Sequence, residues 1–529
     1  MREFYKRDGN VPNANAMQAA LGLIEAMAHF DGSERAIHVR VGGHDNKIYL
    51  DLADAGWSAI EIDAKGWRLV NDPPVRFRRA AGMLALPLPL RGGKIESLRP
   101  FLNVKGDDDF VLAVAWLLAA LRNCGPYPAL ALLGVQGAAK STFTTILRSL
   151  VDPNTAPLRA LPREDRELFI SANNGHVLAF DNVSGLPSWI SDTLCRLATG
   201  GGFAVRQLYT DQDEILFDSR RPIILNGIED YITRPDLADR SIFLALQEIP
   251  ERKRKEEQQL LAEFERERPK ILGVLLDAVA QGLGRLSSVR LERLPRMADF
   301  AKWATACEPA LWQVGTFAKA YDANRAEAVE TVIESDPVAT ALRSFMADRT
   351  EWAGTASDLL GHLSILVSEP ERRGKAWPAA PNKLSGRLRR QATFLRQVGI
   401  QIDDRRSGKT GTRTLRISRR EGEGNLSSEP SEPSAKGNSP LFTSDLAADD
   451  TADDKPPADD SEISIVSRKP LDNKATDDTD DTDDKIPSLY PRGDTVDDDD
   501  FRHLSISAKS DLQAIFDDLC GPATSESSS

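Results

Sequence analysis

The spacing of hydrophobic positions changes along the chain and divides it into four parts. Residues 1–105 combine one helical stretch, 15–30, with short runs in which apolar and polar residues alternate. Such runs are typical of strands that bury one face, so we expect a small α+β unit here. The expected strands lie in residues 36–41, 47–52, 58–63, 67–70 and 75–79.

Residues 106–330 follow another pattern, in which short and wholly apolar runs alternate with longer helical stretches. This alternation predicts an α/β core, with helices covering a parallel sheet. A charged helical stretch, 251–283, predicts a helical lid after the core. The expected strands are 129–133, 176–180, 222–226 and 241–246.

Residues 336–418 predict a compact module in which three helices precede two strands joined by a basic turn. That order is typical of a winged helix, and we expect the module to bind DNA. The helices are expected within 336–346, 355–363 and 381–398, and the strands within 399–403 and 413–418.

Charge separates the last part of the chain from the rest. The net charge is −13, but residues 421–529 alone carry −19, and residues 1–420 therefore carry about +6. Ser, Pro and Asp dominate 421–529, so this acidic tail cannot bury enough apolar surface and is expected to be disordered. Within it, only 511–519 has helical apolar spacing, which makes it a candidate docking peptide for replication proteins.

Composition also limits where the protein works. The four cysteines lie far apart without a C-x-x-C pair, which indicates neither a zinc module nor a disulfide framework and suits a reducing cytoplasm. The longest apolar run has 12 residues, from 110 to 121, and the N-terminus lacks the apolar core of a signal peptide. We therefore expect a soluble, cytoplasmic protein without a membrane partner.

The segment "GVQGAAKST", residues 134–142, fits the phosphate-binding pattern G-x-x-x-x-G-K-[ST] except at Ala139. In such loops backbone N–H groups and a helix N-terminus face the phosphates, lysine neutralises them, and a hydroxyl holds Mg²⁺. We expect Ala139 to adopt helical φ and ψ angles, which tolerate its methyl group, so that ATP binding is weakened or unchanged. A chance match in a Gly- and Ala-rich chain is the alternative. The candidate ATP-binding residues are Gly134, Gly137, Ala139, Lys140, Ser141 and Thr142.

Three further polar residues follow at suitable distances. Asp181 ends an apolar run 41 residues beyond Lys140 and could hold Mg²⁺ together with Ser141. Asn226 ends another run 45 residues later and could orient water or sense the γ-phosphate. Arg240, in "RPDLADR", is placed to reach the nucleotide of a neighbouring subunit.

Together these motifs resemble the superfamily 3 helicases, especially the helicase part of phage and plasmid primase-helicases, which are a branch of the AAA+ ATPases. Residues 197–228 resemble the family's Thr-Gly turn, basic-aromatic hairpin and asparagine-bearing strand. The resemblance implies an ATP-dependent DNA helicase or translocase that forms a ring, expected to be a hexamer, around single-stranded DNA. It assigns catalytic roles to Lys140, Asp181, Asn226 and, as arginine finger, Arg240.

The chain departs from this family at Asn182, where many relatives have an acid that polarises the attacking water. Asp192 is a candidate substitute. The rate of hydrolysis therefore stays open, and an ATP-binding and DNA-binding initiator or regulator with little turnover is an alternative function. A primase is a further rival, but Asp51 and Asp54 are more simply explained as turn formers than as metal ligands.

Two segments are candidate DNA contacts. The resemblance places Arg206 and Tyr209 on a hairpin in the ring channel, where arginine can pair with phosphates and tyrosine can stack on bases of single-stranded DNA. Alternatively, Tyr209 packs under the hairpin and Arg206 pairs with Asp211 or Asp213.

The expected winged helix is a candidate site for duplex or junction DNA. Its third helix can bury Leu384, Leu388 and Leu395 while it offers a basic row to phosphates, and basic residues also surround the turn. A solvated basic helix is the alternative. The basic residues are Lys383, Arg387 and Arg390 on the helix, and Arg405, Arg406, Lys409 and Arg413 on the wing. In cis, the acidic tail could compete with DNA for this module; a tail that only keeps the protein in solution is the alternative.

Overall fold

The computed structural model describes residues 2–201, 203–206, 214–217, 220–228, 231–374, 376–407 and 412–420. The side chains of 2–3, 203–206, 214–217, 405–407 and 412–413 also lie outside the description. The chain divides into two compact units, 1–432 and 433–529, and the acidic tail lies outside the described residues. No helix in the described part is long and apolar enough to cross a membrane.

The N-terminal segment contains the expected strands and two helices, which confirms a small α+β arrangement. Four of its strands form an antiparallel sheet in the order β2-β3-β4-β5, and β1 pairs with β6 in parallel. The elements are α1 (Arg2–Asp8), α2 (Ala14–Phe30), β1 (Ile37–His38), β2 (Val41–His44), β3 (Lys47–Asp51), β4 (Ala59–Asp63), β5 (Gly66–Val70), β6 (Arg76–Phe77) and the 3-10 helix η1 (Ile95–Phe101).

This small sheet shares its hydrophobic core with two helices from later in the chain, α3 (Asp107–Ala120) and α8 (Glu257–Arg285). The Trp67 indole N–H also donates to Asp277 Oδ1 on α8 at 2.8 Å. In the N-terminal sheet, the acids at the end of β3 and just after it act as turn formers. Asp51 Oδ1 accepts from Ala53 N, and Asp54 Oδ1 accepts from Ser58 N.

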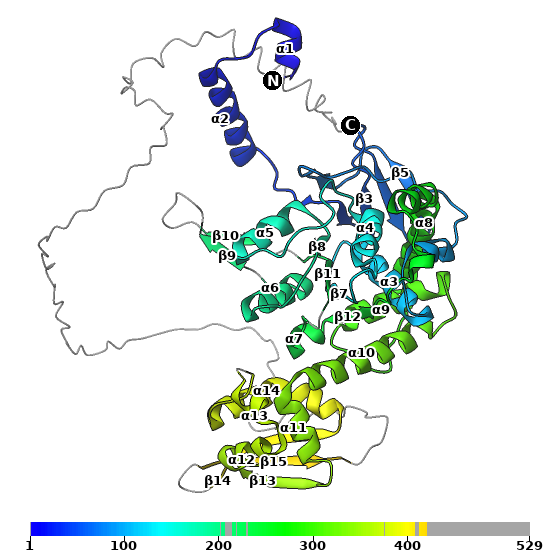
Figure 1. Cartoon of the computed structure of the whole chain (residues 1–529). Coiled ribbons are helices and arrows are strands. Elements are labelled where there is room, and N and C mark those ends of the chain that lie inside the picture. Colours follow the sequence, from blue (N-terminus) through cyan, green and yellow to red (C-terminus); the bar gives the residue numbers. More distant parts are fainter. Residues whose placement is uncertain are drawn as a thin grey trace, which may run out of the picture. The chain divides into compact units, whose positions relative to one another are not determined.

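The centre of the molecule is a parallel sheet of four strands in the order β12-β7-β11-β8 (Figure 1). All three pairings are parallel, as the alternating pattern predicts. Along β7, Leu130 and Leu132 face one hydrophobic cluster while Ala129 and Ala131 face another, so both faces of the sheet are covered. The strands are β7 (Ala129–Leu133), β8 (Leu178–Phe180), β11 (Ile223–Gly227) and β12 (Ser241–Ala245).

Helices cover both faces of this sheet (Figure 1). The cluster on the Leu130 side includes residues of α3, α8, α4 (Lys140–Val151) and α9 (Ala298–Cys307). The cluster on the Ala131 side includes residues of α5 (Asp165–Asn174), α6 (Ser188–Thr199) and α7 (Pro235–Ala238). Between α6 and β11 in the chain, β9 (Phe203–Arg206) and β10 (Glu214–Phe217) pair as an antiparallel hairpin whose tip lies outside the described residues.

The C-terminal α+β unit follows α10 (Thr316–Ser335) and has the winged-helix order of elements, with one strand and one short helix more than the sequence predicts. Its three-stranded sheet has the order β13-β15-β14. The leucines Leu384, Leu388 and Leu395 of α14 are buried, as expected. The elements are α11 (Pro337–Phe345), β13 (Glu351–Thr355), α12 (Ala356–Leu366), α13 (Glu369–Arg373), α14 (Pro381–Gln397), β14 (Ile400–Ser407) and β15 (Thr412–Arg419).

Candidate nucleotide site

The segment 134–139 turns from β7 into α4 at the carboxyl edge of the parallel sheet. Lys140, the first residue of α4, folds back over this turn, and its Nζ donates to the carbonyl oxygens of Gly134 (2.7 Å) and Val135 (3.0 Å). Partial burial lowers the pKa of Lys140, while the nearby Asp181 carboxylate opposes that shift. The ammonium group is therefore held inside the loop, next to an acid.

Ala139 does not have the helical angles that we expected. Its φ of 58° and ψ of 33° are left-handed. An L-residue in this conformation brings Cβ close to the following carbonyl oxygen, at a cost of about 1–2 kcal/mol. The loop pattern has glycine at this position because glycine adopts left-handed angles without a steric cost. In this chain alanine adopts the same angles and bears that cost.

The residues expected from three separate motifs meet at this edge of the sheet. Ser141 Oγ donates to Asp181 Oδ2 at 3.0 Å, and Asp181 Oδ1 accepts from Asn182 N at 2.8 Å. Asn226 Oδ1 also accepts from Asn182 N, at 3.0 Å. The sheet explains this meeting, because β11 lies between β7 and β8 and the carboxyl ends of parallel strands share one edge.

Asn226 is wholly buried and has partners on both amide atoms. Its Nδ2 donates to Thr144 Oγ1 at 3.2 Å, and Thr144 Oγ1 in turn donates to Lys140 O at 3.0 Å. Asn226 therefore ties the turn after β8 to the first turn of α4. In this structure its side-chain partners are Asn182, which follows Asp181, and Thr144 on α4.

Asn182, at the position where the helicase resemblance predicts an acid, is an exposed residue with a left-handed φ of 56°. Asparagine tolerates that conformation better than most residues. The candidate substitute acid, Asp192, forms an ion pair with Arg234 Nη2 at 2.7 Å. In the described part of the chain, Asp192 is thus engaged by an arginine.

Arg240 lies at the opposite edge of the sheet from the loop. It immediately precedes β12, and its carbonyl oxygen accepts from the N–H of Ala129, the first residue of β7. Its Nη1 donates to Asp236 O at 2.5 Å, and its buried Nε has no partner among the described residues. Lys140 and Arg240 of one chain are therefore not brought together.

Two residues that the sequence did not single out lie beside the loop. A Cβ placed on Gly137 would lie 3.3 Å from Arg254 Nη2, which shows how closely this arginine approaches the loop. Arg254 Nε donates to Ile249 O at 3.1 Å, and its Nη2 lies 3.7 Å from Glu248 Oε1. Asn103 Nδ2 donates to the carbonyl of Ala138 at 3.0 Å. The only sequence signal for Arg254 is the basic run "ERKRK", which any solvated helix start could carry.

The candidate DNA contacts of α14 fall into two groups. Lys383 and Arg390 are exposed. Arg387 instead pairs with the buried carboxylate of Asp336, with Nε donating to Oδ2 at 2.8 Å, and also donates to the carbonyl of Ala376. Arg387 therefore fixes α14 to the start of α11, and its charge is largely neutralised.

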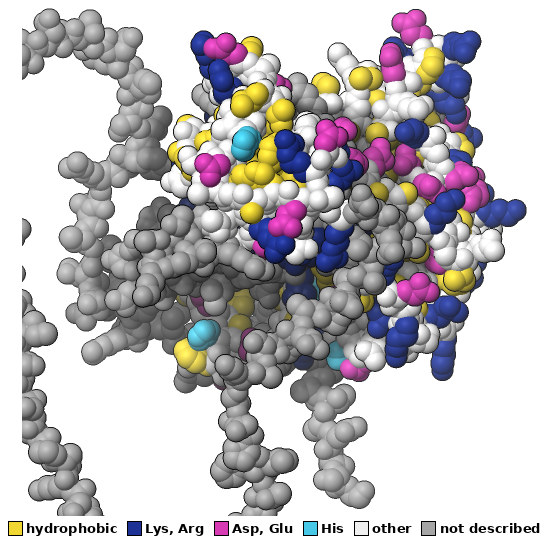
Figure 2. Space-filling view, turned by 90° about the horizontal axis from the view of Figure 1, so that it is seen from below, with side chains coloured by type: hydrophobic (Ala, Val, Ile, Leu, Met, Phe, Trp, Pro, Cys, Tyr) yellow, Lys and Arg dark blue, Asp and Glu magenta, His cyan; other side chains and the backbone are white. Residues whose placement is uncertain are grey.

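The remaining DNA candidates cannot be placed by their side chains. Arg206 belongs to β9, and Arg405 and Arg406 belong to β14, but these side chains and that of Arg413 lie outside the described residues. Tyr209 and Lys409 lie outside them altogether. On the face drawn in Figure 2, Lys and Arg side chains are interspersed with Asp and Glu rather than gathered into one basic surface.

The fold and this edge of the sheet define a class: a parallel α/β core with a phosphate-loop turn, followed by a winged-helix-like unit. Two family models match the chain within these parts. The model "Actinomycete integrative conjugative element replication protein" matches residues 95–329, and the model "AICE RepA C-terminal domain" matches residues 338–433. Together they cover more than half of the chain, which belongs to this family of replication proteins of actinomycete integrative conjugative elements.

Other comparisons add little. No curated protein matches the sequence. Among solved structures, the "A form apo structure of NrS-1 C terminal region-CTR" matches at 10% identity and a TM-score of 0.31, covering 69% of this chain and 94% of that one. A second structure of the region, "CTR(305-718)", matches at 10% identity and a TM-score of 0.28, covering 71% and 95%.

Proposed function

We propose that this replication protein is an ATP-dependent DNA helicase or translocase that acts as an oligomeric ring on single-stranded DNA. The observation that carries the proposal is the cluster of Lys140, Ser141, Asp181 and Asn226 at one edge of a parallel sheet. Three segments far apart in sequence contribute to it. A chance match to the loop pattern would have no reason to place an acid 3.0 Å from the loop's serine.

The residues present fit a nucleotide with magnesium. In the loop, Gly137 has a φ of 84° and Gly134 a φ of 157°, and a Cβ on Gly134 would lie 2.7 Å from Leu246 O. Among the described residues, no side chain accepts a hydrogen bond from the backbone N–H groups of 134–139. No group of three or more His, Cys, Asp and Glu residues suited to a metal occurs in the described part. Mg²⁺ needs no such group, because it is usually held by one or two carboxylates together with water and substrate phosphates.

The roles of the residues follow from this arrangement. ATP with Mg²⁺ would supply the transferable phosphoryl group. Lys140 would leave the loop carbonyls and neutralise phosphate charge, while Ser141 and Asp181 would hold the metal ion. Asn226 would hold the turn that carries Asp181 at a fixed position relative to α4. Arg240 lies at the far edge of its own sheet, so it could serve only the nucleotide of a neighbouring subunit, which favours an oligomer.

A second function has its own support. Asn182 cannot act as a general base as a carboxylate does, and its left-handed backbone suits asparagine. An ATP-binding, DNA-binding initiator or regulator with slow hydrolysis would need the same binding residues and no acid here. The helicase and the regulator therefore differ in the rate at which they hydrolyse ATP.

The test is ATP hydrolysis by the full chain with and without single-stranded DNA. The helicase proposal expects turnover that DNA stimulates and that Lys140→Ala abolishes. Lys319→Ala is the matched control, because Lys319 is an exposed lysine on α10. ATP binding without DNA-stimulated turnover would replace the helicase by the regulator. A native mass measurement with ATP analogue and DNA would give the number of subunits, for which we expect six.

A further inference from the structure

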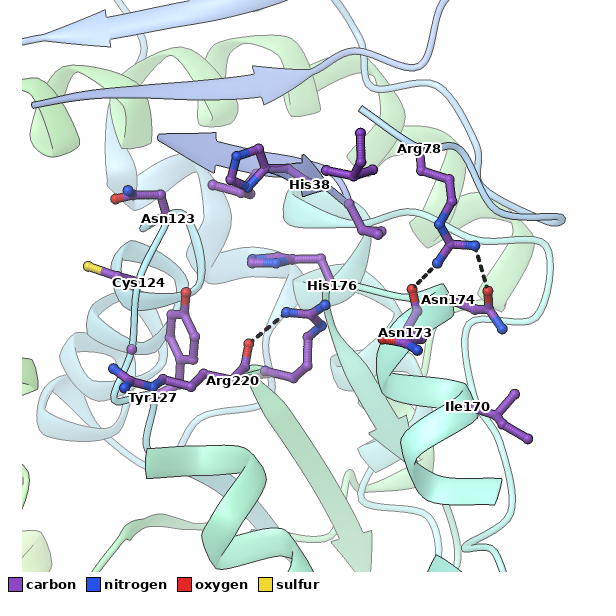
Figure 3. Close-up of a pocket in the computed structure, with 15 residues that line it drawn as sticks. His38, Arg78, Asn123, Cys124, Tyr127, Ile170, Asn173, Asn174, His176 and Arg220 are labelled. Carbon is purple, nitrogen blue, oxygen red and sulfur yellow. Dashed lines mark hydrogen bonds between the residues drawn. The ribbon is translucent and has the colours of Figure 1, made fainter. Parts of the chain in front are cut away.

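A pocket of about 760 Å³ lies at the amino edge of the parallel sheet, away from the phosphate loop. Figure 3 shows the residues that line it. Tyr127, His176 and Arg221 line it, and each stands two residues before the first residue of β7, β8 or β11. The carboxyl ends of the same strands lead to the phosphate loop, Asp181 and Asn226. The pocket and the nucleotide site are therefore separate places on one sheet.

Among the described residues, the charged side chains that line this pocket are all arginines, with no Asp or Glu. Arg78 donates to the Asn174 side chain at 3.1 Å and to the Asn173 carbonyl, as the dashed lines in Figure 3 show. Arg221 donates to the carbonyl oxygens of Ala172 and Gly175, at 2.7 and 3.0 Å. All these partners are neutral.

The third arginine, Arg220, is exposed and has no side-chain hydrogen bond or ion pair among the described residues. Asp152, a carboxylate close enough to act on Arg221, is already paired with Arg40 Nε at 3.1 Å. In the described part of the chain, the three guanidinium groups therefore concentrate positive charge in a pocket whose lining contains no acid. A ligand with several negative charges would be attracted to it.

The rest of the lining suits a nucleotide better than a simple anion. The pocket is far larger than one phosphate group and falls in the size range of small-molecule sites, about 300–1,000 Å³. Asn123 offers an amide to base or sugar edges, and Ile37 and Ile170 expose apolar surface. Burial, together with the charge of Arg221, lowers the pKa of His38, which keeps this ring neutral at pH 7 and able to donate or accept.

The pocket lies close to the β9–β10 hairpin, the segment that is expected to contact single-stranded DNA. Arg220 closely follows β10, and Gly200, which precedes β9, packs directly against the Arg220 guanidinium. Arg220, on one wall of the pocket, thus stands three residues after the end of the β9–β10 hairpin. The opposite wall, with His38 and Arg78, comes from the N-terminal segment.

We propose that this pocket binds the phosphates of single-stranded DNA where the strand passes the base of the β9–β10 hairpin. The inference rests on the proposed function, because it takes DNA as the substrate. It gives the N-terminal segment a part in DNA binding, through Arg78.

The experiment is fluorescence anisotropy of the full chain with a labelled oligothymidine of about 20 nucleotides, titrated at salt concentrations between about 50 and 200 mM. Arg78→Gln with Arg220→Gln should weaken binding about tenfold at the lower salt and reduce the slope of log K against log salt by about 1.4, for two phosphate contacts. Arg76→Gln with Arg166→Gln is the matched control. Both of these arginines are exposed, one on β6 and one on α5, and neither lines the pocket.

Arg220→Gln alone guards against misfolding, because this side chain has no hydrogen-bond or ion-pair partner in the described part. It should leave the thermal midpoint unchanged, lower affinity, and be largely rescued by Arg220→Lys. Equal affinity and equal salt slope for the pocket and control variants would overturn the proposal. So would thymidine monophosphate binding that needs Arg220 while oligothymidine binding does not.

Binding of a fluorescent ATP analogue by the same variants separates this proposal from the proposed function. The two sites lie at opposite edges of the sheet, so the pocket variants should bind the analogue as the wild type does. If the wild type does not bind the analogue but its DNA binding still depends on Arg78 and Arg220, the ATPase proposal is wrong and the proposal for the pocket is retained. Normal analogue binding with insensitive DNA binding would remove the pocket alone.

Discussion

Replacing Ala139 by glycine should stabilise the protein, which is unusual for a change that deletes a methyl group. Ala139 holds a φ of 58° at the start of α4. Glycine adopts such angles without a steric cost, because it has no Cβ. The variant therefore relieves strain in the phosphate loop without removing any group that would face a phosphate.

The size of the effect follows from two opposing contributions. A left-handed alanine costs about 1–2 kcal/mol in the folded state. Glycine gives the unfolded chain more freedom, which offsets about 0.4–1 kcal/mol of that gain. We expect a net increase of about 0.5–1 kcal/mol in the free energy of unfolding. For a domain of about 150–250 residues, that increase corresponds to a rise of about 1–4 °C in the thermal midpoint.

The assay is thermal unfolding of the wild type and of two single variants, Ala139→Gly and Ala138→Gly. Ala138 is the matched control, since it is the adjacent alanine, is fully buried and does not have a positive φ. Glycine there gains no conformational relief and should destabilise by about 0.5–1 kcal/mol or more. If Ala139→Gly lowers the midpoint as much as Ala138→Gly does, the left-handed geometry and the argument built on it are wrong.

Three other predictions follow from buried and loop-side charges. Arg40→Gln should destabilise by about 3–5 kcal/mol in thermal or urea unfolding, because Arg40 and Asp152 are both buried and the carboxylate would lose its partner. Burial lowers the pKa of His176 to about 4 from an ordinary 6.5, so only the unfolded chain takes up this proton between those values. Stability should be full above pH 6.5 and fall by about 3 kcal/mol as pH drops towards 4, a slope that His176→Gln should reduce. Arg254→Ala should weaken ATP-analogue binding about tenfold in calorimetry, while the exposed Arg252→Ala should not.

Much of the central fold could be predicted from the sequence, because its strands are buried on both faces and read as short, uninterrupted apolar runs. The prediction for 129–133 matches β7, and that for 241–246 is one residue longer than β12. Strand β13 was missed for the opposite reason. It is a half-exposed edge strand, "EWAGT", without alternation, and only its pairing with β15 defines it.

The candidate site was predictable in its residues and not in its geometry. The polar residue at each strand end marked Asp181 and Asn226, and parallel topology brought them together. The left-handed angles of Ala139 depend on how the loop closes, and a sequence pattern contains no φ value. Arg254 lies near Gly137 only through the path of the chain after β12, and Arg387 pairs with Asp336 across the C-terminal unit. Such contacts between distant segments leave no local signal.

The central claim is that Lys140, Ser141 and Asp181 form a site for ATP with Mg²⁺, and calorimetric titration with a non-hydrolysable ATP analogue tests it most directly. The wild type should bind the analogue in a magnesium-dependent way. Asp181→Asn should weaken binding about tenfold with Mg²⁺ and little with EDTA, since it removes a ligand of the metal. Asp192→Asn, at an exposed acid that pairs with Arg234, should bind as the wild type does. Absence of binding by the wild type, or equal losses in the two aspartate variants, would contradict the account.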